Sequence, residues 1–256
     1  MTQEIEAVYT VGLDLGQSND FTALTVLEMQ IHASAALLDA HPFGKGITAG
    51  WNSPAGLLRS QLEYVFLEDQ SPWLAKPPVH LRHLERMRGR SYPEMVNDIA
   101  ALLKQPPLST HGYSLVVDAT GVGVPVVDLF RQAEIPVMAV TIHGGDSVNR
   151  ARGGFRVPKR DLVAAVQAVM QTGRLLVAEE LALWPTLKAE LQNFRVTIDP
   201  RTAHDSYSHW REGQHDDLVL SLALAAWFRD MYWKHWDRQR IEERAAEHLE
   251  RHNGRC

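Results

Sequence analysis

The stretch SLVVDATGVGVPVVD, residues 114–128, constrains the fold of this chain more than any other. Its apolar run, Leu115–Val117, ends in the carboxylate of Asp118, and a small Gly-rich turn follows. Apolar residues then recur at helical spacing, at Val126, Val127 and Phe130. This pattern predicts a buried strand, a turn and a helix that open a parallel βαβ unit. Because the carboxyl ends of parallel strands border the ligand crevice, Asp118 is expected at that crevice.

The composition is that of an ordinary soluble globular protein and excludes several classes. With 256 residues, 45% of them hydrophobic and 22% charged, the chain is long enough for one sizeable core. No apolar run approaches the roughly 18 residues that span a bilayer, and the acidic, polar start MTQEIEAVYT is no signal peptide. The single cysteine, Cys256, excludes an internal disulfide framework and a cysteine-based zinc site. We therefore expect a cytoplasmic protein with no membrane partner, in the host-cell cytoplasm if a phage or prophage encodes it.

Hydrophobic periodicity predicts further strands and helices on both sides of the central unit. Strands are expected over Val8–Asp14, Phe21–Met29, Val79–Arg86, Ile135–Ile142 and Leu175–Val177. Helices are expected over Tyr92–Lys104, Asp161–Gly173, Leu181–Phe194 and Leu218–Phe228. The first two strands should form an antiparallel hairpin. Loops are predicted over the Gly- and Arg-rich segment His143–Arg156 and, as a polar hairpin or loop, over Thr202–Gly213.

The domain organisation follows from where this regularity breaks down. Residues 33–76 are punctuated by glycine and proline, so we expect an insertion between strands, with one helix near Pro54–Glu68. The segment 233–256 is densely charged and is expected to be a solvated helical tail. The prediction is a single domain over residues 1–232 followed by this tail.

Acidic residues terminate or open three of the predicted elements. Asp14 ends the first strand, Asp118 ends the central strand, and Asp216 and Asp217 open the late apolar helix in HDDLVLSLALA. If these elements are neighbours, their carboxylates converge, and unpaired like charges at such a distance repel one another. Divalent cations relieve this repulsion, and oxygen-only ligands suit Mg²⁺ or Mn²⁺. Two such ions about 4 Å apart activate water and stabilise the leaving oxygen of a phosphodiester.

Each acid also has a purely structural interpretation. Asp14 is then a polar strand terminus, Asp118 a turn former and Asp216 a helix N-cap, a position that aspartate favours. Taken together on one architecture, the functional interpretation is the stronger one. Asp217 is expected to support the metal site rather than to be its main ligand, and His215 to orient a carboxylate or assist a water.

At these residues the chain resembles the nuclease domain of bacteriophage large terminases. The resemblance extends over about Val8–Phe228 and rests on the motifs GLDLGQSNDFTAL, LVVDATGVGVPVVDLF, GGFRVPKRDLV and GQHDDLVLSLALA. It implies an α/β, ribonuclease H-like fold, in which a mixed sheet of three antiparallel and then parallel strands is flanked by helices. It also implies that Asp14, Asp118 and Asp216 bind two divalent cations, Mg²⁺ or Mn²⁺, and cut double-stranded DNA during genome packaging.

The sequence departs from this family in one respect that bears on partners. Large terminases normally carry an N-terminal packaging ATPase, and this sequence contains no GxxxxGK[ST] phosphate loop. The chain is therefore expected to be an isolated nuclease domain, a split-gene subunit or a related stand-alone nuclease. A separate packaging ATPase, a small terminase subunit or a portal are the partners that the resemblance implies.

A basic segment beside Gly153 and Gly154 is the best candidate for DNA contact. The net charge of −5 argues against a general nucleic-acid coat protein, but a local basic patch is sufficient for a nuclease. The basic side chains of this segment should bind the phosphate backbone of DNA without recognising the base sequence. Its residues are Arg150, Arg152, Arg156, Lys159 and Arg160, of which Lys159 matches the lysine of the family's PK element.

Two functions outside the nuclease class are also compatible with the sequence. An ATPase of the actin and sugar-kinase class shares the same core, and GLDLGQSN resembles its first phosphate loop. A non-catalytic packaging module is the second alternative, although the three acids argue against it. Stabilisation by manganese alone would favour the nuclease, and stabilisation by ATP with magnesium would favour the ATPase. A Holliday-junction resolvase is a variant within the nuclease class.

Overall fold

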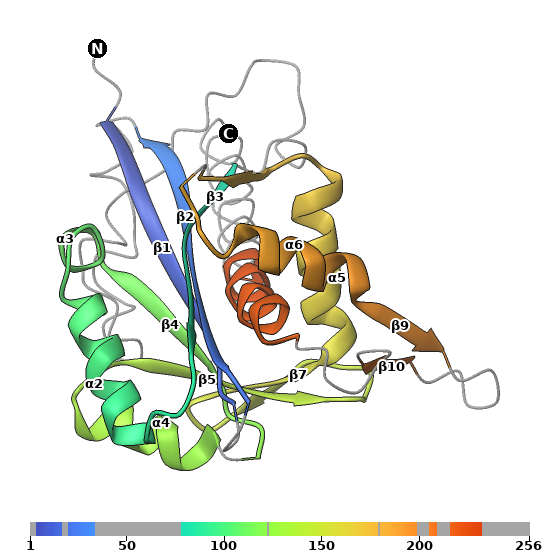
Figure 1. Cartoon of the computed structure of the whole chain (residues 1–256), viewed down its shortest axis with the longest axis horizontal. Helices are drawn as coiled ribbons and strands as arrows, with labels where there is room; N and C mark the ends of the chain where they lie inside the picture. The colour runs from blue at the N-terminus through green and yellow to red at the C-terminus, as the bar shows by residue number, and fades with distance from the viewer. Residues whose placement is uncertain are drawn as a thin grey trace, which may run out of the picture.

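A mixed eight-stranded sheet with the strand order β6-β7-β5-β4-β1-β2-β3-β8 forms the centre of the molecule (Figure 1). The computed structural model describes residues 4–16, 20–33, 78–121, 123–178, 180–198, 205–208 and 216–231. Strands β1 (Glu4–Asp14), β2 (Thr22–Ala33) and β3 (Val79–Met87) pair antiparallel. The predicted hairpin and third strand are therefore confirmed.

The parallel half of the sheet begins where β4 (Tyr113–Asp118) joins β1. Helix α4 (Gly123–Gln132) leads from β4 to β5 (Val137–His143), which lies parallel to β4. This is the βαβ unit that residues 114–128 predict. At the opposite edge, β8 (Leu175–Val177) adds a short parallel strand to β3.

The segment predicted as a loop over His143–Arg156 is instead largely a hairpin. Strands β6 (Asn149–Ala151) and β7 (Gly154–Pro158) pair antiparallel, and β7 also pairs parallel with β5. The strands are too short, and β6 is too exposed, to give an apolar period in the sequence. Within Thr202–Gly213, residues Asp205–Ser208 form β10, which pairs with β9 (Arg195–Ile198) in a separate two-stranded sheet.

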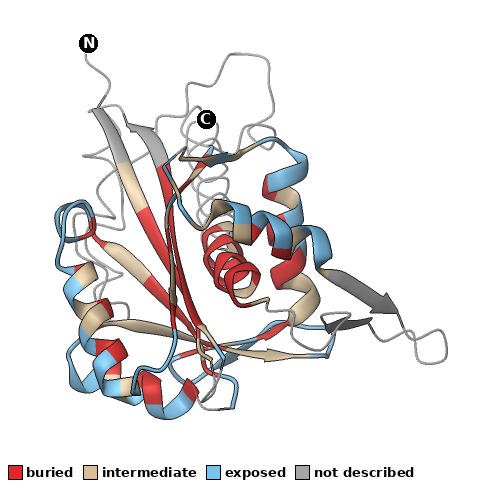
Figure 2. Ribbon diagram, viewed as in Figure 1, coloured by how far each residue is buried: buried red, intermediate tan, exposed pale blue. Residues whose placement is uncertain are grey.

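Helices cover both faces of the main sheet (Figure 1). One face carries α2 (Tyr92–Leu103), α3 (Leu108–His111) and α4. The other carries α5 (Lys159–Gln171), α6 (Trp184–Asn193) and a helix over residues 217–231, drawn in orange-red. Each face has its own hydrophobic core, and the helix over 217–231 is buried almost throughout its length (Figure 2).

Strand alternation decides which side chains reach the helix over 217–231. Val11 and Leu13 of β1 pack into the core under α2 and α4, and so does Val117 of β4. Successive strand residues point to opposite faces, so Asp14 and Asp118 are directed to the side that carries the 217–231 helix. The apolar pattern of the strands thus fixes the face on which both acids lie.

The 217–231 helix approaches β1 most closely at Gly12. A Cβ atom placed on Gly12 would lie 2.0 Å from the carbonyl oxygen of Ser221 and 3.1 Å from Cβ of Ala225. Next to this contact, the hydroxyl oxygens of Thr25 and Ser221 lie 2.7 Å apart. Only glycine permits this backbone contact, which sets the distance between the helix and the sheet.

Several predicted features lie outside the described residues. They are the insertion after Ala33 with its helix near 54–68, and the tail over 233–256. The division into a domain over 1–232 and a tail accordingly stays a prediction. Among the helices that the structure describes, none is long and apolar enough to cross a membrane.

Replacing Gly12 with alanine should destabilise the protein by about 2 kcal/mol or more, because the new methyl group overlaps the Ser221 carbonyl. Urea denaturation of the purified variant measures this loss. Gly144→Ala is the matched control, since a Cβ there meets nothing within 4 Å. Equal losses of stability in the two variants would contradict a close contact at Gly12.

Candidate functional site

Two adjacent parallel strands bring Asp14 and Asp118 together at the carboxyl edge of the sheet. Asp14 is the last residue of β1 and Asp118 the last residue of β4. The preceding residues, Leu13 and Val117, are partners in the parallel ladder. Both carboxylates are therefore side by side on one face, as the sequence predicts.

The helix over 217–231 begins at the same place. The carbonyl of Asp216 accepts a hydrogen bond from the amide of Leu220 at 2.9 Å, so Asp216 holds the N-cap position. Asp217 is the first helical residue, and only 8% of its surface is exposed. The helix thus carries two further carboxylates to the end of β1, where its backbone contacts Gly12 two residues before Asp14.

The electrostatics of Asp14 show that the four acids share one environment. Burial raises the pKa of Asp14 well above its ordinary value, and the charges of Asp118, Asp217 and Asp216 raise it further, in that order. The charge of Lys159 opposes this rise. Burial likewise raises the pKa of the Asp118 carboxyl, whereas hydrogen bonds from Thr120 and the charge of Lys159 lower it.

Two cations offset part of this negative charge. The ammonium of Lys159, the first residue of α5, lies 3.7 Å from Oδ2 of Asp216. The Arg86 guanidinium, on β3, lies with Nη2 2.7 Å from Oδ2 of Asp217. Its side chain is 14% exposed, which makes this a largely buried ion pair. The role of Arg86 has no signal in the sequence, because the residue sits in a strand 131 positions before Asp217.

Glu190 of α6 is a second residue that sequence reasoning misses. Its Oε2 accepts hydrogen bonds from the amides of Leu218 at 3.0 Å and Val219 at 3.2 Å, so Glu190 caps the helix that Asp217 opens. Oε1 of Glu190 lies 3.6 Å from Nη1 of Arg86. Arg86 consequently links this cap to Asp217. The sequence offers one hint of this role. Glu190 follows Leu187 by three residues and therefore lies on the buried face of α6, where an acidic side chain is unusual.

The donor set suits hard divalent cations, which take oxygen ligands. It consists of carboxylates alone, and within the described residues no hydrogen-bond donor reaches the Asp14 carboxylate. The four carboxylates do not point at one common position. Among the described residues, no three His, Cys, Asp or Glu side chains are close enough together to hold one metal ion. The reason is visible in their partners: Asp216 faces Lys159, Asp217 faces Arg86, and Asp118 accepts from the Thr120 amide at 2.7 Å.

The predicted DNA-binding residues occupy different surroundings. Arg152 and Arg156 are exposed on the β6-β7 hairpin. Arg160 pairs with Asp146 at 2.6 Å and is thereby tied to its own loop. Arg150 is also exposed on this hairpin, and of the five predicted residues only Lys159 forms an ion pair with one of the four acids in the described part of the chain. His215 lies outside the described residues.

Comparison with solved structures identifies the class of fold. The large terminase nuclease from the thermophilic phage G20c superposes with a TM-score of 0.50 and 19% identity, covering 86% of this chain and 81% of that one. The fold is therefore ribonuclease H-like, as the motifs predict, and the terminase resemblance is confirmed at the level of the fold.

Two further structures are each similar over 86% of this chain. The zinc-bound form of the phage G20c nuclease gives a TM-score of 0.45 at 19% identity, covering 86% of this chain and 80% of that one. RuvC from Thermus thermophilus gives 0.34 at 11% identity, covering 86% and 92%. Neither a protein-family model nor a curated protein matches this sequence.

The Glu190 cap predicts a specific pH dependence of stability. Burial raises the pKa of Glu190 from 4.5 to about 7, so folding favours its neutral form. The stability that the neutral Glu190 side chain contributes is fully present below pH 4.5. It is lost as the pH rises through 7, because the unfolded chain releases this proton at a lower pH than the folded one. The free energy of unfolding, measured in urea without divalent metal, should fall less between these pH values in Glu190→Gln than in the parent.

Glu190→Ala supplies the contrast to this conservative change. It removes the acceptor for two buried amides and should cost about 1 kcal/mol or more at every pH. Glu180→Gln, at an exposed position, controls for the loss of one charge. If Glu190→Gln and the parent have the same pH profile, the carboxylate is not titrating in this environment.

Proposed function

We propose that this chain is a nuclease that cuts double-stranded DNA with two divalent cations, Mg²⁺ or Mn²⁺. The observation that carries the proposal is the convergence of Asp14, Asp118 and Asp216 from two strands and one helix at one edge of the sheet. The likeness to the phage G20c large terminase nuclease supports it, because that protein has the same fold and is named as a nuclease.

The metal ligands in this proposal are Asp14, Asp118 and Asp216, with Asp217 in support. Bound there, divalent cations would supply Lewis-acid activation of water and stabilise the oxygen that leaves phosphorus. Asp14 is buried, and the charges of the other three acids act on it, so a cation would relieve its repulsion. Arg86 and Glu190 hold Asp217 and the helix N-terminus in place while the charge nearby changes.

Lys159 has two roles in this proposal. It offsets the charge of Asp216 from 3.7 Å, and its hold on that carboxylate would weaken if Asp216 held a cation. An ammonium displaced in this way can bind a phosphate of the DNA backbone beside the cleavage site. The exposed Arg152 and Arg156 extend the contact along the duplex without reading bases, and Arg160 contributes less because Asp146 holds it.

The biological setting proposed is viral genome packaging. The partners proposed for this setting are those that the terminase resemblance implies, namely a packaging ATPase, a small terminase subunit or a portal. A cytoplasmic location, in the host cell, follows from that setting. The proposed nuclease activity rests on the four acids and does not depend on which partner the protein has.

Asp118→Asn should lower plasmid cleavage in manganese by about a hundredfold or more, because it removes a ligand of ions that supply several kcal/mol of transition-state stabilisation. The assay is conversion of supercoiled to nicked or linear plasmid. Asp128→Asn is the matched control, since this exposed acid on α4 pairs only with Arg131 among the described residues. Parental activity in a folded Asp118→Asn protein would contradict the assignment.

Lys159→Ala should weaken DNA binding and flatten its salt dependence. One lost phosphate contact reduces the slope of log K against log salt by about 0.9. Fluorescence anisotropy over a salt series, with a labelled duplex and magnesium, measures the slope. Lys104→Ala, an exposed lysine beyond the end of α2, should leave the slope unchanged. An unchanged slope in Lys159→Ala would show that this lysine makes no phosphate contact.

A further inference from the structure

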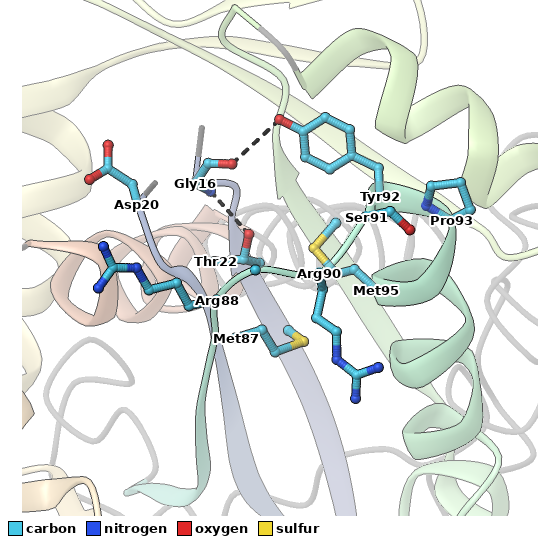
Figure 3. A pocket seen from close by; sticks show the side chains of 11 residues that line it. Gly16, Asp20, Thr22, Met87, Arg88, Arg90, Ser91, Tyr92, Pro93 and Met95 are labelled. Atoms are coloured by element: carbon cyan, nitrogen blue, oxygen red, sulfur yellow. Dashed lines mark hydrogen bonds between the residues drawn. The ribbon is translucent and has the colours of Figure 1, made fainter. Parts of the chain in front are cut away.

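A cavity of about 360 Å³ opens between Gly16 and Thr22, at the end of β1 and the start of β2, and the loop from β3 to α2 (Figure 3). Gly16 and Thr22 line it on one side, and Arg88, Tyr92 and Met95 on the other. The Tyr92 hydroxyl donates to the Gly16 carbonyl at 3.4 Å, and the Gly16 amide donates to Oγ1 of Thr22 at 3.1 Å. The first of these bonds ties the two walls to each other, and the second holds the Gly16 side together. The cavity is therefore built into the fold rather than formed by one loop.

The lining combines an apolar floor with a cationic rim. Met87 and Met95 are buried, with 8% and 2% of their surfaces exposed, and the Tyr92 ring lies beside them. Arg88 and Arg90 line the opening. Methionine and an aromatic ring provide the polarizable surface on which planar rings pack. Guanidinium groups bind phosphate oxygens, so the lining is suited to a ligand with both parts.

The cavity and the acid cluster lie on opposite sides of the same strand ends. Gly16 follows Asp14 by two residues, and Met87 follows Arg86, which pairs with Asp217. Met87 packs into the core under α2 and α4, whereas Arg86 reaches the other face of the sheet. A polynucleotide that passes over this edge can therefore contact both sites.

A row of arginines connects the two sites. The guanidinium of Arg86 lies 4.0 Å from the centre of the Phe21 ring, and that of Arg88 lies 5.2 Å from it. Arg90 follows at the cavity rim, where its Nη2 lies 3.3 Å from Asp98. Arg86 is engaged with Asp217 and Glu190, and Arg90 with Asp98, so the exposed Arg88 is the best placed of the three to meet a phosphate of the strand. One acid, Asp20, also lines the cavity and suits the amino group of a base.

We propose that this cavity binds one unpaired nucleotide of the DNA strand next to the cleavage site. Its base packs on Met87, Met95 and Tyr92, and its phosphate contacts Arg88. The nucleotide is unpaired because a base stacked in a duplex cannot enter a concave site. The volume lies within the range of sites for small organic ligands. This inference rests on the proposed function and specifies its substrate as duplex DNA with a single-stranded extension.

The test compares two labelled probes by fluorescence anisotropy: a blunt 20-base-pair duplex and the same duplex with a five-nucleotide unpaired tail. The protein carries Asp118→Asn, so that neither probe is cut, and the buffer contains magnesium. We expect the tailed duplex to bind about fivefold tighter or more. Arg88→Gln should bring this ratio to about one, whereas Arg131→Gln, an exposed arginine on α4, should leave it intact. Equal binding of both probes, or a ratio that survives Arg88→Gln, would overturn the proposal.

A third probe distinguishes a binding site for the base from a contact with the phosphate alone. Its tail consists of abasic nucleotides, which keep every phosphate and lack every base. The abasic tail should lose the preference, and an abasic tail that binds as well as the natural one would overturn the base-binding site. Plasmid cleavage by the unsubstituted protein reports separately on the proposed function. Loss of tail preference with cleavage retained would therefore refute the cavity alone.

Discussion

The repulsion among buried carboxylates is the constraint on which this site depends. Asp118, Asp216 and Asp217 all act on the carboxyl of Asp14 at one edge of the sheet, where burial removes the water that would otherwise screen it. Lys159 and Arg86 compensate two of the four acids. A fold gains no stability from gathering like charges, so the arrangement is best explained by a ligand of opposite charge.

The packing keeps these charges together against their repulsion. At Gly12 the 217–231 helix contacts the backbone of β1, and the Thr25 and Ser221 hydroxyls meet beside this contact. Glu190 caps the same helix from α6, and Arg86 connects that cap to Asp217. The elements that carry the acids are thus held by contacts from three sides, while the carboxylates themselves would have to turn from their present partners to share a cation.

The features that the sequence predicts are those with a local physical signal. Buried strands and amphipathic helices carry their periodicity with them, which is why β4, α4 and the 217–231 helix are predicted correctly. The edge strand β6 and its neighbour β7 are too short for such a signal. The acids are predictable because they end or begin strong elements, whereas Arg86 and Glu190 act through contacts across the sheet and between helices. No pattern along the chain encodes such contacts.

The central claim is that the acids at the ends of β1, β4 and the 217–231 helix bind divalent metal. The most direct measurement is anomalous diffraction from crystals of the protein soaked in manganese. We predict anomalous peaks between the carboxylates of Asp14, Asp118 and Asp216, with Lys159 moved away from Asp216. A map with manganese elsewhere on the molecule and no peak among these three side chains would contradict the claim.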